Sequence, residues 1–142
     1  MKAALEEAEK ALALGEVPVG AVFVKGEKII ARGHNSSISL HDASAHAEMI
    51  ALRQAGQALG NYRLTDTELY VTLEPCIMCM GALVHGRVKR ILFGARDPKA
   101  GAAGSVFDFS CDERLNHCIE VKEGILEEQC RSLLQDFFRS KR

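Results

Sequence analysis

The stretch ELYVTLEPCIMCMGALVH, residues 68–85, contains a strand pattern and a helix pattern in close succession. Residues 68–73 are rich in aliphatic, aromatic and β-branched side chains, which is typical of a buried strand. Pro75 suits the first position of a helix, where a missing N–H group costs nothing, so we expect a helix from there to the end of the stretch. Cys76 and Cys79 would then lie one turn apart at the helix N-terminus. The stretch therefore predicts a strand–helix unit with two thiols at its junction.

Outward from this unit, the chain alternates between strand and helix patterns. We expect helices at residues 2–14, 45–59 and from 126 to near the C-terminus, and strands at 17–24, 28–33, 88–94 and within 118–124. The first two strands flank Gly26 and predict a β-hairpin. A hairpin followed by alternating strands and helices implies a mixed sheet covered by helices. We therefore predict an α/β fold in a single domain, residues 1–142, built as a three-layer α/β/α sandwich around a central mixed five-stranded sheet.

Composition limits the classes of function. The formal net charge is −1, which gives no general signal for nucleic acid, although basic residues gather at positions 139–142. No apolar run has the length of a membrane helix, and the acidic N-terminus does not resemble a signal peptide. Five cysteines are an odd number for a disulfide framework. We therefore expect a cytoplasmic protein in which Cys111, Cys118 and Cys130 are ordinary thiols.

Cys76 and Cys79 allow three interpretations. A helix N-terminus favours the thiolate form, which binds metal ions. Thioredoxin-like redox proteins also place a C-x-x-C pair after a strand and at a helix start, and the two thiols could equally be inert and buried. Zinc usually takes four ligands, so a metal site would need partners from elsewhere in the chain.

His46 and Glu48, in the stretch SAHAEM, favour the metal. If the two helix N-termini meet, His46 supplies a third ligand and leaves a fourth position open, as in catalytic zinc sites. Sulfur and nitrogen ligands favour zinc, although ligand type alone leaves iron open. Residues two apart on a regular helix point nearly opposite ways, so this pair must lie in the first turn. Glu48 is then the proton shuttle of a hydrolytic reaction rather than a ligand.

The two halves together, H46-A-E48 and P75-C76-I-M-C79, resemble the signature of the zinc-dependent cytidine/deoxycytidylate deaminase family. The resemblance covers nearly the whole chain and is closest to the bacterial tRNA-specific adenosine deaminases, through stretches such as EVPVGAV, NYRL and FGARDPKAGAAGS. It implies a cytidine-deaminase-like fold. It also implies one Zn²⁺ per subunit, held by His46, Cys76 and Cys79, with Glu48 as the catalytic residue.

The same resemblance implies a substrate and the pocket that holds it. The reaction would be hydrolytic deamination of adenosine to inosine at the wobble position of a tRNA anticodon loop, by a cytoplasmic homodimer with no membrane partner. Asn35 would lie against the flipped base, and Val19 would form part of the apolar wall. Asp97 and Lys99 would handle the nucleotide around the base, and the basic end at 139–142 would suit the anticodon stem.

Two other functions remain open at this point. A free-base or nucleoside deaminase of the guanine or cytosine type would share the zinc site but act on small molecules. A thioredoxin-like redox protein would bind no metal and would cycle a Cys76–Cys79 disulfide. The absence of tryptophan and the presence of His46 and Glu48 count against the redox function.

Overall fold

The computed structural model describes all 142 residues and contains one five-stranded mixed sheet with the strand order β2-β1-β3-β4-β5. Its strands are β1 (Gly20–Lys25), β2 (Lys28–His34), β3 (Thr67–Leu73), β4 (Arg90–Ala95) and β5 (Glu120–Lys122). Strand β1 pairs antiparallel with both β2 and β3, whereas β3–β4 and β4–β5 are parallel. The predicted mixed five-stranded sheet is confirmed.

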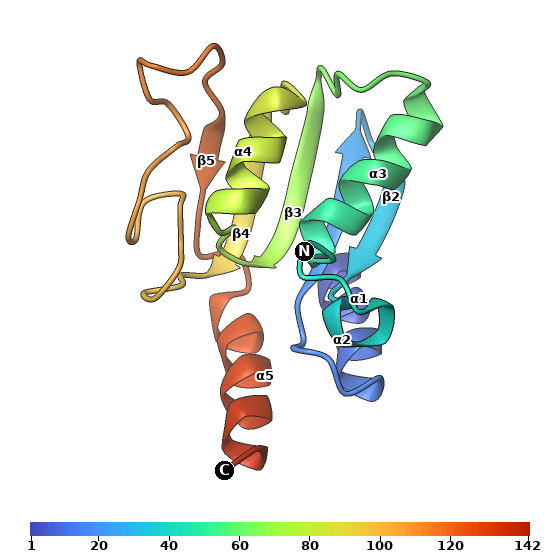
Figure 1. Ribbon diagram of the computed structural model, residues 1–142, viewed down its shortest axis with the longest axis vertical. Coiled ribbons are helices and arrows are strands. Elements are labelled where there is room, and N and C mark those ends of the chain that lie inside the picture. Colours follow the sequence, from blue (N-terminus) through green and yellow to red (C-terminus); the bar gives the residue numbers. More distant parts are fainter.

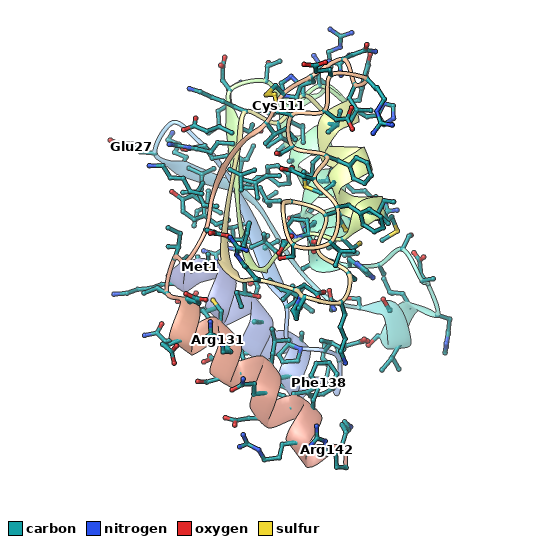
Figure 2. The ribbon with its side chains drawn as sticks, turned by 90° about the vertical axis from the view of Figure 1, so that its left-hand side faces the viewer. Met1, Glu27, Cys111, Arg131, Phe138 and Arg142 are labelled. Carbon is teal, nitrogen blue, oxygen red and sulfur yellow. A yellow bond between two sulfur atoms is a disulfide. The ribbon has the colours of Figure 1, made fainter.

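Helices cover both faces of this sheet. They are α1 (Lys2–Ala13), α2 (Ser37–Leu40), α3 (Ala47–Leu59), α4 (Ile77–His85) and α5 (Glu127–Ser140). Helices α3 and α4 lie side by side on one face, and α1 and α5 lie on the other, with the lower part of α5 extending beyond the sheet (Figures 1 and 2). This is the three-layer arrangement that the sequence predicts. No helix has the length and apolar character needed to cross a membrane.

The ends of the predicted elements follow local backbone chemistry. Gly26, in the hairpin turn between β1 and β2, and Gly60, which ends α3, both adopt the left-handed conformation with φ of 63°. Glycine reaches this region without the steric cost that a Cβ atom imposes. The turn and the helix stop therefore lie where the sequence places them.

A close contact between β2 and α3 fixes where the start of α3 lies. A Cβ atom added at Gly33 would lie 2.5 Å from the carbonyl oxygen of Ala47 and 2.7 Å from the backbone nitrogen of Ala51. Only glycine leaves room for the helix backbone to approach the strand this closely. At the outer edge of the same strand, the Arg32 N–H donates to Oε1 of Gln54 on α3 at 3.2 Å. These contacts hold α3, and the residues at its N-terminus, against the sheet.

Three local expectations are wrong. Strand β1 begins at Gly20 rather than at residue 17, and the loop expected after β2 contains the short helix α2. Pro75 is not the first helical residue: Cys76 is the N-cap, with extended backbone angles of φ −79° and ψ 177°. The chain stays extended past the end of β3, because the Glu74 N–H donates to the Ala95 carbonyl oxygen and Cys76 itself forms an isolated bridge with Gly101.

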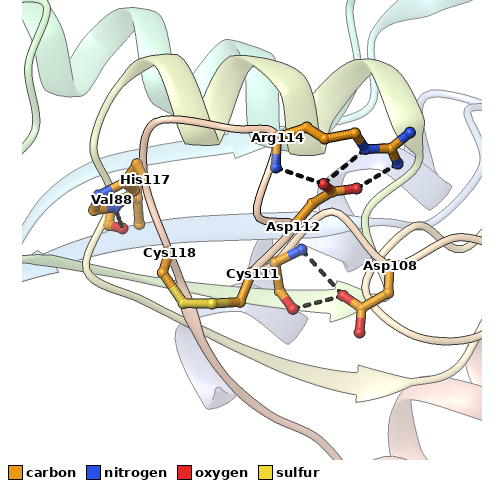
Figure 3. Close-up of a disulfide and its surroundings, with 8 residues drawn as sticks. Val88, Asp108, Cys111, Asp112, Arg114, His117 and Cys118 are labelled. Atoms are coloured by element: carbon orange, nitrogen blue, oxygen red, sulfur yellow. Dashed lines mark hydrogen bonds and ion pairs between the residues drawn. A yellow bond between two sulfur atoms is a disulfide. The ribbon is translucent and has the colours of Figure 1, made fainter.

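The prediction that Cys111 and Cys118 are ordinary thiols is also wrong, because the structure joins them in a disulfide with a sequence separation of 7 (Figure 3). The odd count of cysteines could not reveal this pair, which forms because the chain turns back on itself. The Ile119 N–H donates to the Ser110 carbonyl oxygen at 2.6 Å and closes the base of the turn beside the bond. Cys130 is free and buried, as expected, and its burial raises the pKa of its thiol to about 11.

Removing this disulfide is expected to lower the stability of the fold. Cross-linking so short a loop stabilises a protein by about 2.5 kcal/mol in the chain-entropy account, because it restricts the unfolded chain. The double variant Cys111→Ser/Cys118→Ser should therefore unfold at a lower urea concentration than the oxidised protein, with free energies measured by linear extrapolation. The reduced wild-type protein is the control and should match the variant. Equal midpoints for oxidised and reduced protein would show that the bond does not stabilise the fold.

Candidate active site

Three side chains that could together hold a metal ion meet where α3 and α4 begin. Nδ1 of His46 lies 3.6 Å from Sγ of Cys76 and 3.6 Å from Sγ of Cys79, and the three ligand atoms all lie within 4.8 Å of one another. His46 is the N-cap of α3 and has extended backbone angles, φ −75° and ψ 156°. It therefore lies just outside the helix rather than in its first turn. This removes the geometric conflict between His46 and Glu48 that a regular helix would create.

The spacing of these atoms fits a tetrahedral zinc ion. Zinc bonds of about 2.0–2.1 Å to nitrogen and about 2.3 Å to sulfur hold the two ligand atoms about 3.6 Å apart in a tetrahedron. Both His–Cys separations in the structure are 3.6 Å. The donor set, one imidazole nitrogen and two sulfurs, is also one that zinc prefers. The residues present therefore fit this metal.

The two thiols differ in their surroundings. A hydrogen bond from the Cys79 thiol is the largest influence on Cys76 and, together with contact with His46, lowers its pKa to about 4 against the opposing effect of burial. The same hydrogen bond raises the pKa of Cys79, whose side chain is buried. Contact with the Cys76 sulfur raises the pKa of His46. The cluster thus favours negative charge on Cys76, the form in which a thiol binds metal.

Glu48 is buried beside this cluster, with 4% of its surface exposed. Burial is the largest influence on the carboxyl group and raises its pKa. The side chain lies within hydrogen-bonding reach of the Cys79 thiol. A carboxyl group whose proton affinity is raised, next to a set of metal ligands, is suited to take up and release protons during hydrolysis.

Asn35 directly follows β2, Val19 directly precedes β1, and the two residues are hydrogen-bonded to each other. Asn35 Oδ1 accepts a hydrogen bond from the Ala47 N–H at 2.9 Å, and the Asn35 N–H donates to the Val19 carbonyl oxygen at 3.1 Å. The side-chain oxygen of Asn35 is therefore occupied in holding the first turn of α3. Its NH₂ group has no partner in the structure and is free to donate to a ligand. Val19 is buried, with 4% of its surface exposed.

Asp97 and Lys99 belong to the loop that follows β4. Asp97 Oδ1 accepts from the Lys99 N–H at 3.0 Å and from the Ala100 N–H at 3.2 Å, so this carboxylate shapes its own loop. The loop reaches the metal cluster, because the Ala102 N–H donates to the Pro75 carbonyl oxygen at 2.8 Å and Cys76 forms an isolated bridge with Gly101. The loop thus runs alongside the start of α4.

A basic groove of about 710 Å³ lies between this loop and α5. We define it by its charged and aromatic lining: Arg96, Asp97, Lys99, Arg131, Phe138, Arg139 and Arg142. Glu123 pairs with Arg96, and Asp136 pairs with Arg139. Lys99 and Arg142 take part in no ion pair and remain available to a negatively charged ligand. A surface of this charge attracts negatively charged partners.

Sequence reasoning missed two buried carboxylates, Glu16 and Glu74. Glu16 accepts from the N–H groups of Ile38 and Ser39 and from the Ser39 hydroxyl, and so caps the start of α2. Burial alone would raise the pKa of Glu16, but these hydrogen bonds outweigh it and hold the pKa below its usual value. Glu74 accepts hydrogen bonds from the loop after β4. The only signal in the sequence is that each glutamate adjoins an expected strand and has no lysine or arginine three or four residues away to pair with.

Comparison with known proteins places the chain in a family. The model of the MafB19-like deaminase family matches residues 1–142. The chain is similar to the tRNA-specific adenosine deaminase of Haemophilus influenzae, with 53% identity over 100% of this chain and 83% of that one. It is also similar to a solved structure from a study of A-to-I editing by tRNA:A34 deaminases at the wobble position of transfer RNA, with a TM-score of 0.91, 42% identity, and coverage of 94% of this chain and 97% of the other.

A guanine deaminase of Bacillus subtilis is less similar. It has a TM-score of 0.66 and 33% identity, over 98% of this chain and 90% of that one. The cytidine-deaminase-like fold is thus shared with enzymes that act on different bases, while the greater similarity is to the enzymes of tRNA. The chain therefore belongs to the deaminase family, in the group of the tRNA-specific adenosine deaminases.

Proposed function

We propose that this protein hydrolyses adenosine to inosine at the wobble position of a tRNA anticodon loop. The observation that carries the proposal is a buried glutamate beside a His/Cys/Cys cluster of tetrahedral spacing. It occurs in a chain that resembles tRNA-specific adenosine deaminases along its whole length.

Zinc is the metal that we assign to His46, Cys76 and Cys79. When bound, it supplies Lewis acidity that makes a water molecule a better nucleophile near neutral pH. The thiolates of Cys76 and Cys79 would neutralise the formal charge of the ion, so this acidification would be weaker than at a site with three imidazoles. A neighbouring base is consequently needed, and the buried carboxylate of Glu48 is placed to be that base.

The remaining residues hold the substrate and move protons. Glu48 accepts a proton from the attacking water and passes it to a ring nitrogen of the base. It then takes the second proton from the newly attached hydroxyl group and passes it to the leaving amine, so that ammonia departs and a carbonyl group remains. The NH₂ group of Asn35 donates to the base, while the side-chain oxygen holds the Ala47 N–H. Val19 supplies an apolar surface for the flipped base.

The basic groove is the surface that we assign to the RNA backbone. Lys99 and Arg142 supply unpaired positive charge there, beside the exposed ring of Phe138. Phosphate contacts of this kind make binding fall as the salt concentration rises. On the strength of the proposed tRNA substrate, we also assign the enzyme to the cytoplasm.

We assign a homodimer to the protein. Support comes from an exposed apolar surface on α4 and the loop beside it, where Ile77 has 53% of its surface exposed, Phe107 46% and Leu115 39%. Side chains of this size gathered on one surface are typical of a protein interface. Sedimentation velocity should give twice the mass of the chain, and Ile77→Glu should give the monomer.

Two substitutions at Asn35 are expected to separate its two roles. Asn35→Asp keeps an oxygen for the Ala47 N–H but removes the NH₂ donor, so folding should be retained while kcat/KM falls by about tenfold or more, since a lost hydrogen bond in a buried site costs about 1–3 kcal/mol. Asn35→Ala should lose both, with a lower melting temperature as well. Thermal unfolding and single-turnover inosine formation measure the two effects. Wild-type kcat/KM in the Asp variant would remove Asn35 from the substrate site.

The central experiment supplies the zinc-loaded protein with an anticodon stem-loop that carries adenosine at the wobble position. Free adenosine, guanine and cytosine are tested in parallel for release of ammonia. Inosine in the stem-loop alone is the expected result. Turnover of guanine or cytosine alone would keep the roles of Glu48 and the cluster but overturn the assignment to tRNA.

A further inference from the structure

Glu74 is a buried carboxylate that binds no cation. Only 2% of its surface is exposed. Oε1 accepts from the Asp97 N–H at 3.1 Å and from the Ser105 hydroxyl, and Oε2 accepts from the N–H groups of Ala103 and Ser105, each at 3.0 Å. Burying a charge away from water is costly unless hydrogen bonds compensate for it. Here both ends of one loop provide that compensation.

This arrangement shapes the loop from Asp97 to Ser105 around a single side chain. A Cβ atom added at Gly101 would lie 2.4 Å from Oε2 of Glu74, so the middle of the loop has also closed upon the carboxylate. Asp97 is held to Glu74 by its N–H, while its own carboxylate holds the N–H of Lys99. The position of Lys99 in the basic groove therefore depends on Glu74 indirectly, through Asp97.

Glu74 also connects this loop to the metal cluster. It lies two residues before Cys76, which pairs with Gly101 in an isolated bridge. In Figure 1 the segment after β4 passes beside the start of α4. The carboxylate of Glu74 thus fixes the position of the loop that carries Asp97 and Lys99 relative to the His46/Cys76/Cys79 cluster.

We propose that Glu74 is a positioning residue for RNA recognition: it orders the loop from Asp97 to Ser105 so that the nucleotides next to the target adenosine are held beside the metal cluster. The inference rests on the proposed function. Because Glu74 reaches neither the base nor the metal, its loss should weaken the binding of RNA more than the chemical step.

The test replaces Glu74 with glutamine in the zinc-loaded protein. A glutamine amide has only one acceptor oxygen. Its NH₂ group would therefore face N–H groups that now donate to the carboxylate, and donors cannot pair with donors. We expect KM for the stem-loop to rise by about tenfold or more while kcat changes by less than about threefold, since hydrogen bonds to a buried charge are strong. Zinc content should stay at the wild-type level. Glu9→Gln, the same change on the exposed surface of α1, is the matched control and should behave as wild type.

Ser105→Ala is a milder second variant, in case Glu74→Gln folds poorly. It removes one of the four hydrogen bonds, so it should raise KM in the same direction by a smaller factor. The effect of combining the two should be less than additive, because they share Oε1. Unchanged KM in both variants would overturn the proposal, as would loss of zinc together with kcat, which would make Glu74 part of the metal centre.

Hydrogen exchange separates this inference from the proposed function. The amides of Asp97, Ala103 and Ser105 should lose protection in Glu74→Gln and keep it in Glu9→Gln, whatever the substrate. If the wild-type protein makes no inosine, the proposed function fails and the exchange data still decide whether Glu74 orders the loop. If protection is unchanged, the positioning role fails even when the enzyme edits RNA.

Discussion

Glu48→Ala is expected to retain zinc and to lose nearly all turnover. The three ligand atoms remain in place, because none belongs to Glu48. The proton shuttle is removed, and a positioned acid–base group contributes about 10²- to 10⁴-fold to the rate. Single-turnover inosine formation and metal analysis on the same sample measure both quantities.

Glu48→Gln is the matched control for packing. Alanine leaves a cavity at a site that is only 4% exposed, whereas glutamine fills the same volume without a titrating group. Both variants should lose turnover, and the glutamine variant should melt at or above the wild-type temperature, since burial disfavours the ionised carboxylate that it replaces. A wild-type rate in either variant would contradict the assigned mechanism.

Cys76→Ala is expected to lose the metal itself. Loss of a partner that merely orients a ligand weakens metal binding by about 10- to 100-fold, so removal of a ligand should weaken it by more than about a hundredfold. Titration of the loaded protein with a chromophoric chelator measures this affinity directly. Turnover should fall with zinc occupancy and return in part when zinc is added in large excess.

Cys130→Ala is the control for this substitution. Cys130 is more deeply buried than Cys76, with 1% of its surface exposed, but it packs under Gly94 on the opposite side of the sheet and is not part of the cluster. Its loss should leave zinc affinity unchanged. Equal zinc affinity in Cys76→Ala and the wild type would show that Cys76 is not a ligand.

Elements that depend on local chemistry could be predicted from the sequence. The hairpin turn at Gly26 and the end of α3 at Gly60 were predicted because glycine adopts the left-handed backbone that these positions need. The short helix α2 could not be predicted in this way, since its N-terminus is held by Glu16, which lies far upstream in the chain. The pairing of Cys111 with Cys118 likewise depends on a turn that no pattern marks.

Some residues of the candidate site could likewise be predicted from the sequence, and others could not. His46, Cys76 and Cys79 could be named together because their spacing and their places at helix starts are features of the sequence, and the structure brings them within 4.8 Å of one another. The assigned roles of Asp97 and Lys99 remain predictions. The role proposed for Glu74 could not be predicted from the sequence, because the N–H groups that donate to it converge only when the loop folds over it.

Both edges of the sheet discourage the addition of another strand. On β2, charged Lys28 and Arg32 line the edge, and Gln54 occupies the Arg32 N–H. At the other edge, β5 is only 3 residues long and begins and ends with a charged side chain. Short, charged or covered edges protect proteins from edge-to-edge aggregation. Copies of this chain are therefore poor templates for fibrils, and a pair of them would be held by helix and loop side chains that substitutions can alter without disturbing the sheet.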